Sequence, residues 1–428
     1  MDKTQHSNIM ASEAIVPKKL IVVGGGAAGF FCAINAAKAN PDLSVVLVEK
    51  SNKLLSKVKV SGGGRCNVTH ACFDIEALVK CYPRGQSFLK KVFHWFNTTH
   101  TIQWFEERGV DLKVEADGRM FPSTNTSQTI IDCLLREATK YNVEIIMSCE
   151  VKKIGYENNL FQLSAPDSRC SHLSANFLCI ACGGFPKSAQ FDWLKEIQHT
   201  IEAPVPSLFT FNIPNNPITK LMGLSVEQAT IKIVGSKLSQ QGALLITHWG
   251  MSGPVVLKLS AWAARELANK NYEFTIAVNW LSGYTENSLR DEWAYFRNQF
   301  ASSKIHQKNP FNIPTRLWHY LLNESFIKEG VRWAELTSKQ QNQLIKVLTV
   351  QEFVIKGKTT FKEEFVTCGG IKLSEIDANT LESRLVPNLF FAGEIIDVDG
   401  ITGGFNFQNA WTTGWIAAKA IAAASAIE

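Results

Sequence analysis

Residues 20–29 read LIVVGGGAAG, an apolar run of strand formers that enters a G-x-G-x-x-G turn. An alanine-rich helix is expected after the turn, and a second β-branched run follows and ends at Glu49. In such a unit Gly24 makes the tight turn, Gly26 lets a pyrophosphate approach the backbone, and Gly29 lets helix and strand pack closely. The helix N-terminus then faces the phosphates, and Glu49 accepts hydrogen bonds from a ribose. The pattern predicts a dinucleotide site; the alternative is a glycine-rich turn in an ordinary βαβ unit.

The composition fits a large folded protein. The chain has 428 residues, of which 45% are hydrophobic, enough to form two or three domains. The net charge of +5 is concentrated in residues 50–91, where nine basic residues face two acidic ones. This local excess suits a ligand that bears phosphates, and a solvated basic face is the alternative.

The ten cysteines lie mostly in apolar or strand-like surroundings, and residues 1–18 lack the apolar core of a signal peptide. We therefore expect reduced thiols and a cytoplasmic protein. Cys179 and Cys182 spell C-x-x-C at the end of an expected buried strand, without a second pair, so we predict no metal site. The apolar tail after Ile416 contains Lys419 and is too short to span a bilayer, so no membrane contact is predicted.

The pattern of periodicity predicts a first domain that is interrupted by a second one. Residues 1–17 are polar and are predicted to be a disordered extension. After a second glycine turn at 61–67, helices are expected at 89–108 and 127–141, a hairpin at 115–122, and strands at 143–151, 161–164 and 177–181. The aromatic residues of 88–105 fall near helical spacing, which indicates core packing rather than a nucleic-acid surface.

The inserted part changes character along its length. Strands are expected at 207–213, 226–234, 242–248 and 272–280, and helices between 286 and 348. Strand character returns at 361–370, followed by a strand at 388–394, a glycine turn at 402–406 and a C-terminal helix. The predicted domains are 18–190 with 361–428, and an inserted substrate domain 191–360 made of a mainly β-barrel part (191–283), a helical lobe (284–350) and a return (351–360).

An N-terminal phosphate site that meets a C-terminal strand, glycine turn and helix across an insertion is typical of flavoproteins. We therefore predict the α/β class, with a Rossmann-like FAD-binding domain of the glutathione-reductase type interrupted by the barrel and the helical lobe. FAD is the predicted cofactor.

At this point the sequence resembles the BaiN/RdsA (YhiN-like) family of NAD(P)/FAD-dependent oxidoreductases. The match rests on four motifs: the first glycine turn with Glu49-Lys50, SGGGRCN at 61–67, LITH at 245–248 with SGP at 252–254, and AGE at 392–394 through GGFN at 403–406. The chain departs from the family where Cys182 replaces a threonine and where the segment after Phe185 lacks a glycine-rich loop.

The resemblance implies the roles of many residues toward FAD. The pyrophosphate would be held by Gly24, Gly26, Ala27, Ala28 and Gly29, and the adenosine end by Glu49 and Lys50, with the Val151 backbone at the adenine and Gly183 beside the dinucleotide. The second turn would contribute Gly64, Arg65, Cys66 and Asn67, and the C-terminal motif Gly393, Glu394, Gly404, Phe405 and Asn406. Residues 403–406 would place a helix N-terminus under the flavin pyrimidine, where its partial positive charge makes the flavin easier to reduce.

Reduction of a carbon–carbon double bond by hydride from flavin N5 also needs a proton donor. Cys66 and His248 have side chains suited to this work. The alternatives are that Cys66 only packs on the flavin and that His248 only bonds the backbone. Arg65 is better explained as an anchor for the cofactor or the loop. No second G-x-G-x-x-G follows a strand, so NAD(P)H, the expected reductant, would visit the flavin transiently.

Members of the resembled family reduce either a uracil of large-subunit ribosomal RNA to dihydrouridine or the enone of a steroid acid. The basic stretch at 50–91 favours RNA, because a polyanion releases counterions when its phosphates are neutralised. A steroid-like enone would instead require a deep apolar cavity between barrel and flavin, for which Trp249, Met251 and Trp318 are candidate lining residues. A flavin-binding sensor without catalysis is the third alternative.

Overall fold

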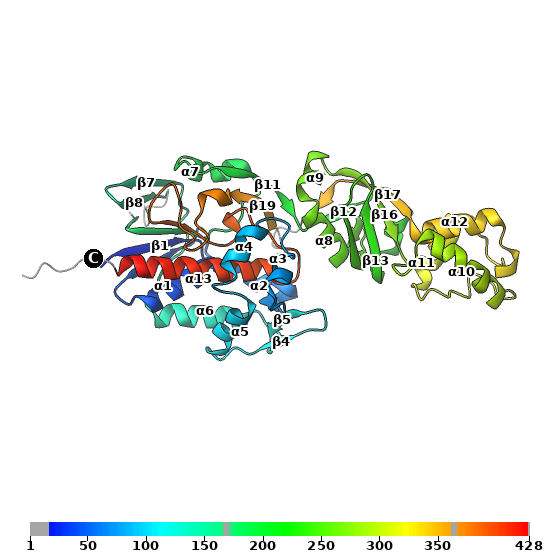
Figure 1. The fold of residues 1–428 in the computed structure, drawn as a ribbon, viewed down its shortest axis with the longest axis horizontal. Coiled ribbons are helices and arrows are strands. Elements are labelled where there is room, and N and C mark those ends of the chain that lie inside the picture. Colours follow the sequence, from blue (N-terminus) through cyan, green and yellow to red (C-terminus); the bar gives the residue numbers. More distant parts are fainter. Residues whose placement is uncertain (1–16, 166–169, 171–172, 361–365, 427–428) are drawn as a thin grey trace, which may run out of the picture.

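The computed structural model describes residues 17–165, 170, 173–360 and 366–426. Two separate hydrophobic cores divide these residues into a first domain and an inserted domain. Figure 1 shows the two bodies side by side along the long axis, with the C-terminus at the end of the first domain that faces away from the insertion. The expected extension, residues 1–17, lies outside the described residues except for Pro17.

The first domain is built on a five-stranded parallel sheet with the order β20-β10-β1-β2-β6. Its strands are β1 (Lys19–Val23), β2 (Ser44–Val48), β6 (Glu144–Ile146), β10 (Phe177–Ile180) and β20 (Leu389–Phe391). The β-branched residues of β1 and β2 are almost fully buried, as expected for strands covered on both faces. The predicted α/β Rossmann-like class is confirmed.

Helices α1 (Ala27–Ala39) and α13 (Phe405–Ser425) pack closely against each other in the first domain, as Figure 1 shows. Gly414 makes this approach feasible, because a Cβ there would lie 2.6 Å from the Ala28 carbonyl oxygen. Helix α6 (Gln128–Lys140) packs against α1. The two helices that follow glycine turns, α1 and α13, are thus held side by side, with their N-termini near the carboxyl ends of the sheet strands.

Smaller elements surround the sheet. Two three-stranded sheets are formed by β3 (Thr69–His70), β5 (Arg119–Pro122) and β4 (Leu112–Val114), and by β7 (Lys153–Glu157), β8 (Leu160–Ser164) and β9 (Leu173–Ala175). Short helices are α2 (Ser56–Gly64), α3 (Ile75–Val79), α4 (Gln86–Val92), α5 (Thr98–Glu106), α7 (Asp192–Lys195), η2 (Ser188–Phe191), η5 (Leu373–Glu375) and η6 (Gly393–Ile395). The single helix expected at 89–108 is wrong: Asn97 caps a new helix, α5, with its side chain.

The two domains are joined by β11 (Ile201–Ser207) and β19 (Val366–Ile371), which pair in antiparallel fashion. Phe191 and Leu194 belong to the first core, whereas the second core begins at Phe209. The structure therefore places residues 191–207 with the first domain and moves the domain boundary from 190 to about Ser207. The change in sequence pattern after Phe185 corresponds to the short helices η2 and α7, and the inserted domain begins only after them.

The inserted domain contains a seven-stranded antiparallel sheet with the order β17-β16-β13-β14-β15-β12-β18. Its strands are β12 (Thr210–Asn212), β13 (Ser225–Ile233), β14 (Ser239–Ile246), β15 (Gly250–Ser252), β16 (Glu273–Asn279), β17 (Gln351–Lys356) and β18 (Lys358–Thr359). The edge strands β17 and β18 follow each other through Gly357, which bonds both Tyr272 and Asn212, so the sheet curls into a barrel-like shape. Helices α8 (Pro254–Trp262), α9 (Ala264–Asn269) and η3 (Pro217–Leu221) accompany it.

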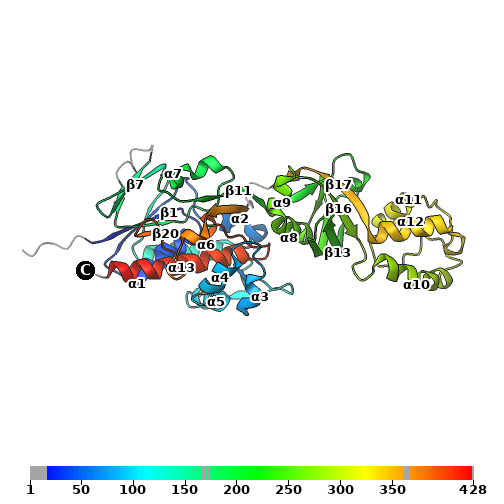
Figure 2. The same cartoon turned by 45° about the horizontal axis from the view of Figure 1, so that its top comes forward.

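A helical lobe forms the far end of the inserted domain, as Figure 2 shows. It consists of α10 (Glu286–Gln299), α11 (Thr315–Glu324), η4 (Trp333–Glu335) and α12 (Ser338–Thr349). Thr285 and Thr337 cap α10 and α12 with capping boxes. Trp293, Trp318 and Trp333 are fully buried against one another and make the lobe's core.

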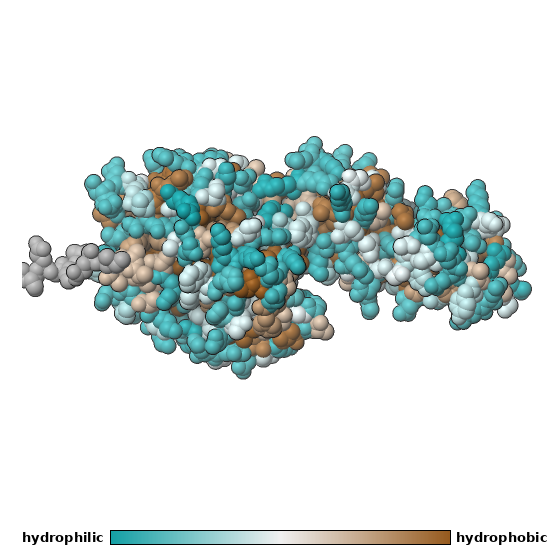
Figure 3. Space-filling view, in the orientation of Figure 1, coloured by the Kyte–Doolittle hydropathy of each residue, from teal (hydrophilic) through white to brown (hydrophobic). Residues whose placement is uncertain are grey.

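The expectation of reduced thiols is wrong for one pair, because Cys149 and Cys170 form a disulfide with their Cα atoms 6.0 Å apart. Their spacing along the chain gave no signal of this proximity, which depends on the folding of β7–β9. Helices of the described ranges include none with both the length and the apolar character needed to cross a bilayer. Figure 3 shows a face dominated by hydrophilic residues, with hydrophobic residues in small separate groups.

Candidate active site

A cavity of about 590 Å³ lies at the carboxyl ends of β1, β10 and β20, where parallel sheets bind ligands. The first domain lines it with residues 24–28, 181–184, 402–404 and the start of α13. The inserted domain and the junction contribute Leu208, Thr210, Ser252, Leu257 and Val366 to the same cavity. One cavity therefore joins the predicted dinucleotide cradle to the insertion.

The first glycine turn has the geometry that its sequence predicts. A Cβ on Gly24 would lie 2.5 Å from the Ala181 carbonyl oxygen, and one on Gly29 only 1.9 Å from the Gly24 carbonyl oxygen. A Cβ on Gly26 would meet nothing within 4 Å, so this position opens into the cavity. Ala27 and Ala28, which start α1, also line the cavity. The free N–H groups of a helix N-terminus there suit a phosphate.

Glu49 braces this turn while lining the cavity. Its Oε2 accepts a hydrogen bond from the Gly25 N–H at 2.8 Å, and its Oε1 accepts one from the Ser51 N–H at 2.9 Å. Each oxygen keeps a further lone pair for a ligand hydroxyl. Lys50 also lines the cavity, with its Nζ 5.6 Å from the centre of the Phe185 ring.

In the second glycine turn, Gly62, Gly63 and Gly64 all have positive φ angles, between 58° and 83°. Gly62 faces the cavity, whereas Gly64 does not line it. Asn67 lines the cavity, and its amide, oriented to satisfy both partners, donates to the Thr69 oxygen and accepts from the Gly404 N–H.

Arg65 is directed away from the cavity lining. Its Nη1 lies 2.6 Å from Glu115 Oε1, and its guanidinium lies 4.0 Å from the centre of the Phe121 ring. These contacts tie Arg65 to residues of its own region, and its predicted contact with the cofactor stays a prediction.

The structure does not bring the two candidate proton donors to the cavity. Cys66 is fully buried and absent from the lining. Burial raises the pKa of its thiol to about 12, against the opposing effect of a hydrogen bond with Ser61. His248 is exposed, packs edge-on against Trp249 at 4.3 Å, and does not line the cavity either.

The C-terminal motif closes the cavity from the other side. Gly183 and Gly393 line it with left-handed backbone, at φ of 76° and 79°. Glu394 lines it too, and accepts hydrogen bonds from Lys57 Nζ at 2.6 Å and from the Thr367 N–H at 2.7 Å. This carboxylate is therefore fixed in place and neutralised by a cavity-lining lysine.

The N-terminus of α13 points into the cavity. Gly404 caps it in left-handed backbone, and a Cβ there would lie 2.5 Å from the Thr69 oxygen. Asn406 lines the cavity and bonds both the N–H and the oxygen of Gly400. Phe405 is buried against His70 instead, with ring centres 4.6 Å apart, and Val151 is buried outside the lining.

Several cavity residues were not predicted from the sequence. Asn409 is the most telling, since its Oδ1 is buried without a hydrogen-bond partner among the described residues. Its position three residues after Asn406 was a usable signal, because both then lie on one face of a helix. Cys182 lines the cavity, and burial raises its pKa to about 12. Arg119 and Lys57 also line it.

These features define a two-domain protein whose Rossmann-type domain offers a dinucleotide cradle at its junction with an insertion. The open position at Gly26, the helix N-termini and the unpartnered Asn409 oxygen all fit an extended ligand with phosphates and polar rings. No group of three metal-ligating side chains occurs among the residues the structure describes.

The chain belongs to the family described as the HI0933-like protein Rossmann domain, whose model matches residues 18–420. It is 27% identical over 410 residues to the 3-dehydro-bile acid delta(4,6)-reductase of Clostridium scindens, and 29% identical over 418 residues to the ribosomal RNA dihydrouridine synthase of Escherichia coli. Each alignment covers 94% of this chain and 98% of the relative. These findings confirm the resemblance drawn from the motifs.

Among solved structures, the chain is similar to the 3-ketosteroid-delta4-(5alpha)-dehydrogenase of Rhodococcus jostii RHA1 in complex with 4-androstene-3,17-dione. The TM-score is 0.48 and the sequence identity 11%, and the match covers 97% of this chain and 99% of that chain.

Proposed function

We propose that this protein is an FAD-dependent oxidoreductase that reduces a carbon–carbon double bond, with NAD(P)H as reductant and a uridine of large-subunit ribosomal RNA as substrate. The observation that carries the proposal is the shared cavity. The N-termini of α1 and α13 line it from the first domain, and Leu208, Ser252 and Leu257 line it from the junction and the insertion. A cofactor and a substrate can thus meet in one cavity.

The residues of the cavity fit FAD. Gly26, Ala27 and Ala28 would hold its pyrophosphate, and Glu49 with Lys50 its adenosine end. Asn406 and Asn409 would face the flavin from α13, whose N-terminus favours negative charge on the ring. When bound, FAD supplies hydride transfer. The chain's own residues orient both partners.

Proton delivery can be tested directly on the two predicted donors. Since neither side chain lines the cavity, we expect Cys66→Ala and His248→Ala to keep at least half of the wild-type turnover, roughly. A loss of about 100-fold with unchanged flavin content would assign the donor role to the residue that was replaced.

The charge of residues 50–91 is partly neutralised in the folded protein. Lys57, Arg65, Arg84 and Lys90 form ion pairs with acidic residues. The exposed Lys53, Lys59, Lys80 and Lys91 form no ion pair within the described part of the chain. These four lysines are therefore free to bind the phosphates of RNA, and Lys53 lines the cavity itself.

A second candidate substrate is a small-molecule enone with a steroid-like body. Leu208, Leu257 and Val366 give the junction side of the cavity an apolar lining, which suits such a body. One relative is named as a bile acid reductase and the other as a ribosomal RNA dihydrouridine synthase, so the two names correspond to the two candidate substrates.

The test compares dihydrouridine in large-subunit ribosomal RNA from cells with and without the gene, by mass spectrometry of nuclease digests. Loss of one dihydrouridine on deletion, restored by the wild-type gene, would support the RNA substrate. Unchanged dihydrouridine, together with oxidation of the reduced protein by an enone, would assign the small-molecule reaction. Anaerobic titration of the purified protein with NADH and NADPH, followed by flavin absorbance, tests the reductant separately.

A further inference from the structure

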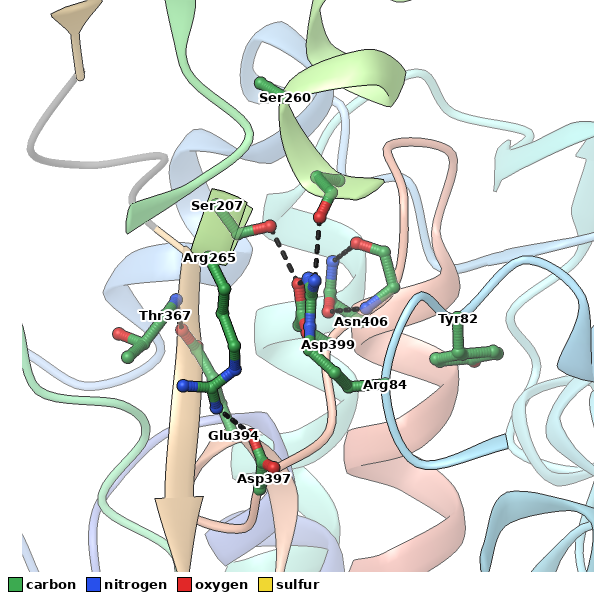
Figure 4. A network of polar contacts seen from close by, with 12 residues as sticks. Tyr82, Arg84, Ser207, Ser260, Arg265, Thr367, Glu394, Asp397, Asp399 and Asn406 are labelled. Carbon is green, nitrogen blue, oxygen red and sulfur yellow. Dashed lines mark hydrogen bonds and ion pairs between the residues drawn. The ribbon is translucent and has the colours of Figure 1, made fainter. Parts of the chain in front are cut away.

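The junction between the two domains contains a buried ion pair that the proposed reaction does not use. Asp399 is 0% exposed and lies in the segment between η6 and α13. Arg84 donates from Nε and Nη2 to the two carboxylate oxygens, and the Ser207 hydroxyl donates to Oδ2 at 2.7 Å. Figure 4 shows the three side chains converging from three separate segments. A carboxylate this deeply buried depends on such partners.

Arg84 also reaches into the inserted domain. Its Nη1 donates to the Ala261 carbonyl oxygen at 2.8 Å, in the last turn of α8. Carbonyl groups at a helix C-terminus lack helical partners and attract a cation. One guanidinium therefore binds the first domain with one edge and the end of α8 with its remaining nitrogen.

A second pair crosses the junction in the opposite direction. Arg265, at the start of α9, donates to Asp397 Oδ1 and to the Ala203 oxygen, both at 3.2 Å. Asp397 precedes Asp399 by two residues, so Arg84 and Arg265 both bind the same short segment of the first domain.

This segment continues directly into the cavity. Gly400 follows Asp399, and both of its backbone polar groups bond the side chain of Asn406, which lines the cavity from the first turn of α13. On the other side of the pair, α8 contributes Leu257 to the same cavity, one turn before Ala261. The Arg84–Asp399 pair thus stands between two walls of the site that come from different domains.

We propose that Arg84 and Asp399 are positioning residues that fix α8 against the segment leading into α13, and so set where the inserted domain's side chains stand over the cavity. The two domains have separate hydrophobic cores, so the angle between them depends on the junction. The kinetic part of the test rests on the proposed function, and the structural part does not.

The test uses Arg84→Lys, which keeps the charge but cannot bond both Asp399 and Ala261, and Asp399→Asn, which keeps the shape but removes the charge. Lys90→Gln is the matched control, since Lys90 forms an exposed ion pair with Glu76 inside the first domain. We expect amides in the last turn of α8 to exchange about tenfold faster in both variants and to be unchanged in the control. Small-angle X-ray scattering should show a broader distribution of overall dimensions.

In kinetics, the two half-reactions should separate. Reduction of bound flavin by NAD(P)H should stay within roughly twofold of wild type, while kcat/KM for the oxidising substrate falls about tenfold, mainly through KM. Ser207→Ala, which leaves the Arg84 contacts in place, should show a smaller change of the same kind.

Unchanged exchange in α8 and unchanged scattering in both variants would overturn the proposal, as would an equal loss in both half-reactions. If the wild-type protein reduces neither RNA nor enone, the proposed function fails, and the exchange experiment still decides the positioning role. If Asp399→Asn does not fold, the double variant Arg84→Met with Asp399→Leu removes the charges together and keeps the volume. Tight, wild-type-like protection of α8 in that variant would equally overturn the proposal.

Discussion

In the first domain a parallel sheet is covered by helices that pack through glycine and alanine, whereas in the inserted domain an antiparallel sheet is followed by a lobe that packs around tryptophan. Of the five fully buried tryptophans among the described residues, only Trp411 belongs to the first core. Large aromatic side chains such as Phe31 and Trp411 fill the first core as well, so the difference lies in the close backbone approach at the glycine turns and the α1–α13 contact, which the tryptophan-packed helical lobe lacks.

This difference also divides the cavity. The first domain contributes the backbone of its glycine turns together with polar side chains such as Glu49 and Asn409, while the insertion and the junction contribute side chains such as Leu257 and Thr210. Backbone N–H groups suit an invariant cofactor, and side chains can vary with the substrate. Substitutions in the two domains should therefore affect cofactor binding and substrate use separately.

The largest effect on flavin binding is expected from Gly29→Ala. The new Cβ would lie 1.9 Å from the Gly24 carbonyl oxygen, so α1 must move away from the turn. We expect loss of bound flavin and a stability decrease of about 3 kcal/mol in the cofactor-free protein. Thermal unfolding of that form and flavin absorbance of the purified protein measure the two effects.

Gly26→Ala is the matched control. Its Cβ would meet no protein atom within 4 Å, but it would project into the cradle. We expect the cofactor-free protein to unfold at nearly the wild-type temperature while flavin affinity falls about tenfold or more. Equal destabilisation by both substitutions would show that the two glycines do not have distinct roles.

Trp318→Ala tests whether the inserted domain unfolds independently. The side chain is fully buried, and its Nε1 donates to the Ile305 oxygen at 2.8 Å. The cavity left behind should cost about 3–5 kcal/mol and unfold the helical lobe first. Calorimetry should then show two transitions, with flavin still bound through the first. A single transition with loss of flavin would mean that the two cores unfold as one unit.

The sequence predicted the first domain well because its motifs state backbone requirements. The spacing from Gly24 to Glu49 allows few other geometries, and the strands, helix and acid lie where the pattern placed them. In the insertion, periodicity predicted strands and helices, but it missed α8, whose apolar residues follow SGP without a polar face. The domain boundary was displaced because composition changes at 185 while the core changes only after Ser207.

The candidate site was less predictable where side-chain direction matters. Cys66 lies two residues after the last of three glycines. Its backbone has a φ of 61°, and its thiol lies in the core rather than in the cavity. A glycine turn shows that backbone passes close to something, but not which way the next residue points. The Arg84–Asp399 pair joins residues 315 positions apart, and no local pattern encodes such a contact.

Acid should weaken the first domain through His199. The ring is 2% exposed, and its Nδ1 and Nε2 lie 3.1 Å from Glu375 and 3.0 Å from Ser383. Burial lowers the pKa of His199 below its ordinary 6.5, although Glu375 acts in the opposite direction. The unfolded chain therefore binds this proton at a higher pH than the folded protein does. Stability should fall as pH drops from 6.5 toward the lowered pKa.

Urea unfolding between pH 7.5 and 5 measures this loss. His199→Gln should flatten the pH dependence while lowering stability at pH 7.5, and substitution of the exposed His94 serves as the control. A pH dependence that persists in His199→Gln would assign the acid sensitivity to another group, such as His306 of the helical lobe, whose pKa burial also lowers.

The smallest effect is expected for Glu286→Gln in the helical lobe. Glu286 lies 2.7 Å from Arg290 on α10, and both side chains are largely open to solvent, at 40% and 46% exposure. Removing this pair should cost no more than about 0.5 kcal/mol, and the cost should vanish in high salt.

Glu137→Gln is the contrasting variant in the first domain, because Glu137 and its partner Arg108 are each only 5% exposed. Its loss should reach about 3 kcal/mol and persist in salt, since the buried Arg108 then keeps, among the described residues, only the longer 3.6 Å ion pair with Glu107. A loss of stability in Glu286→Gln as large as that in Glu137→Gln would mean that the exposed pair stabilises the lobe as strongly as the buried pair stabilises the first domain.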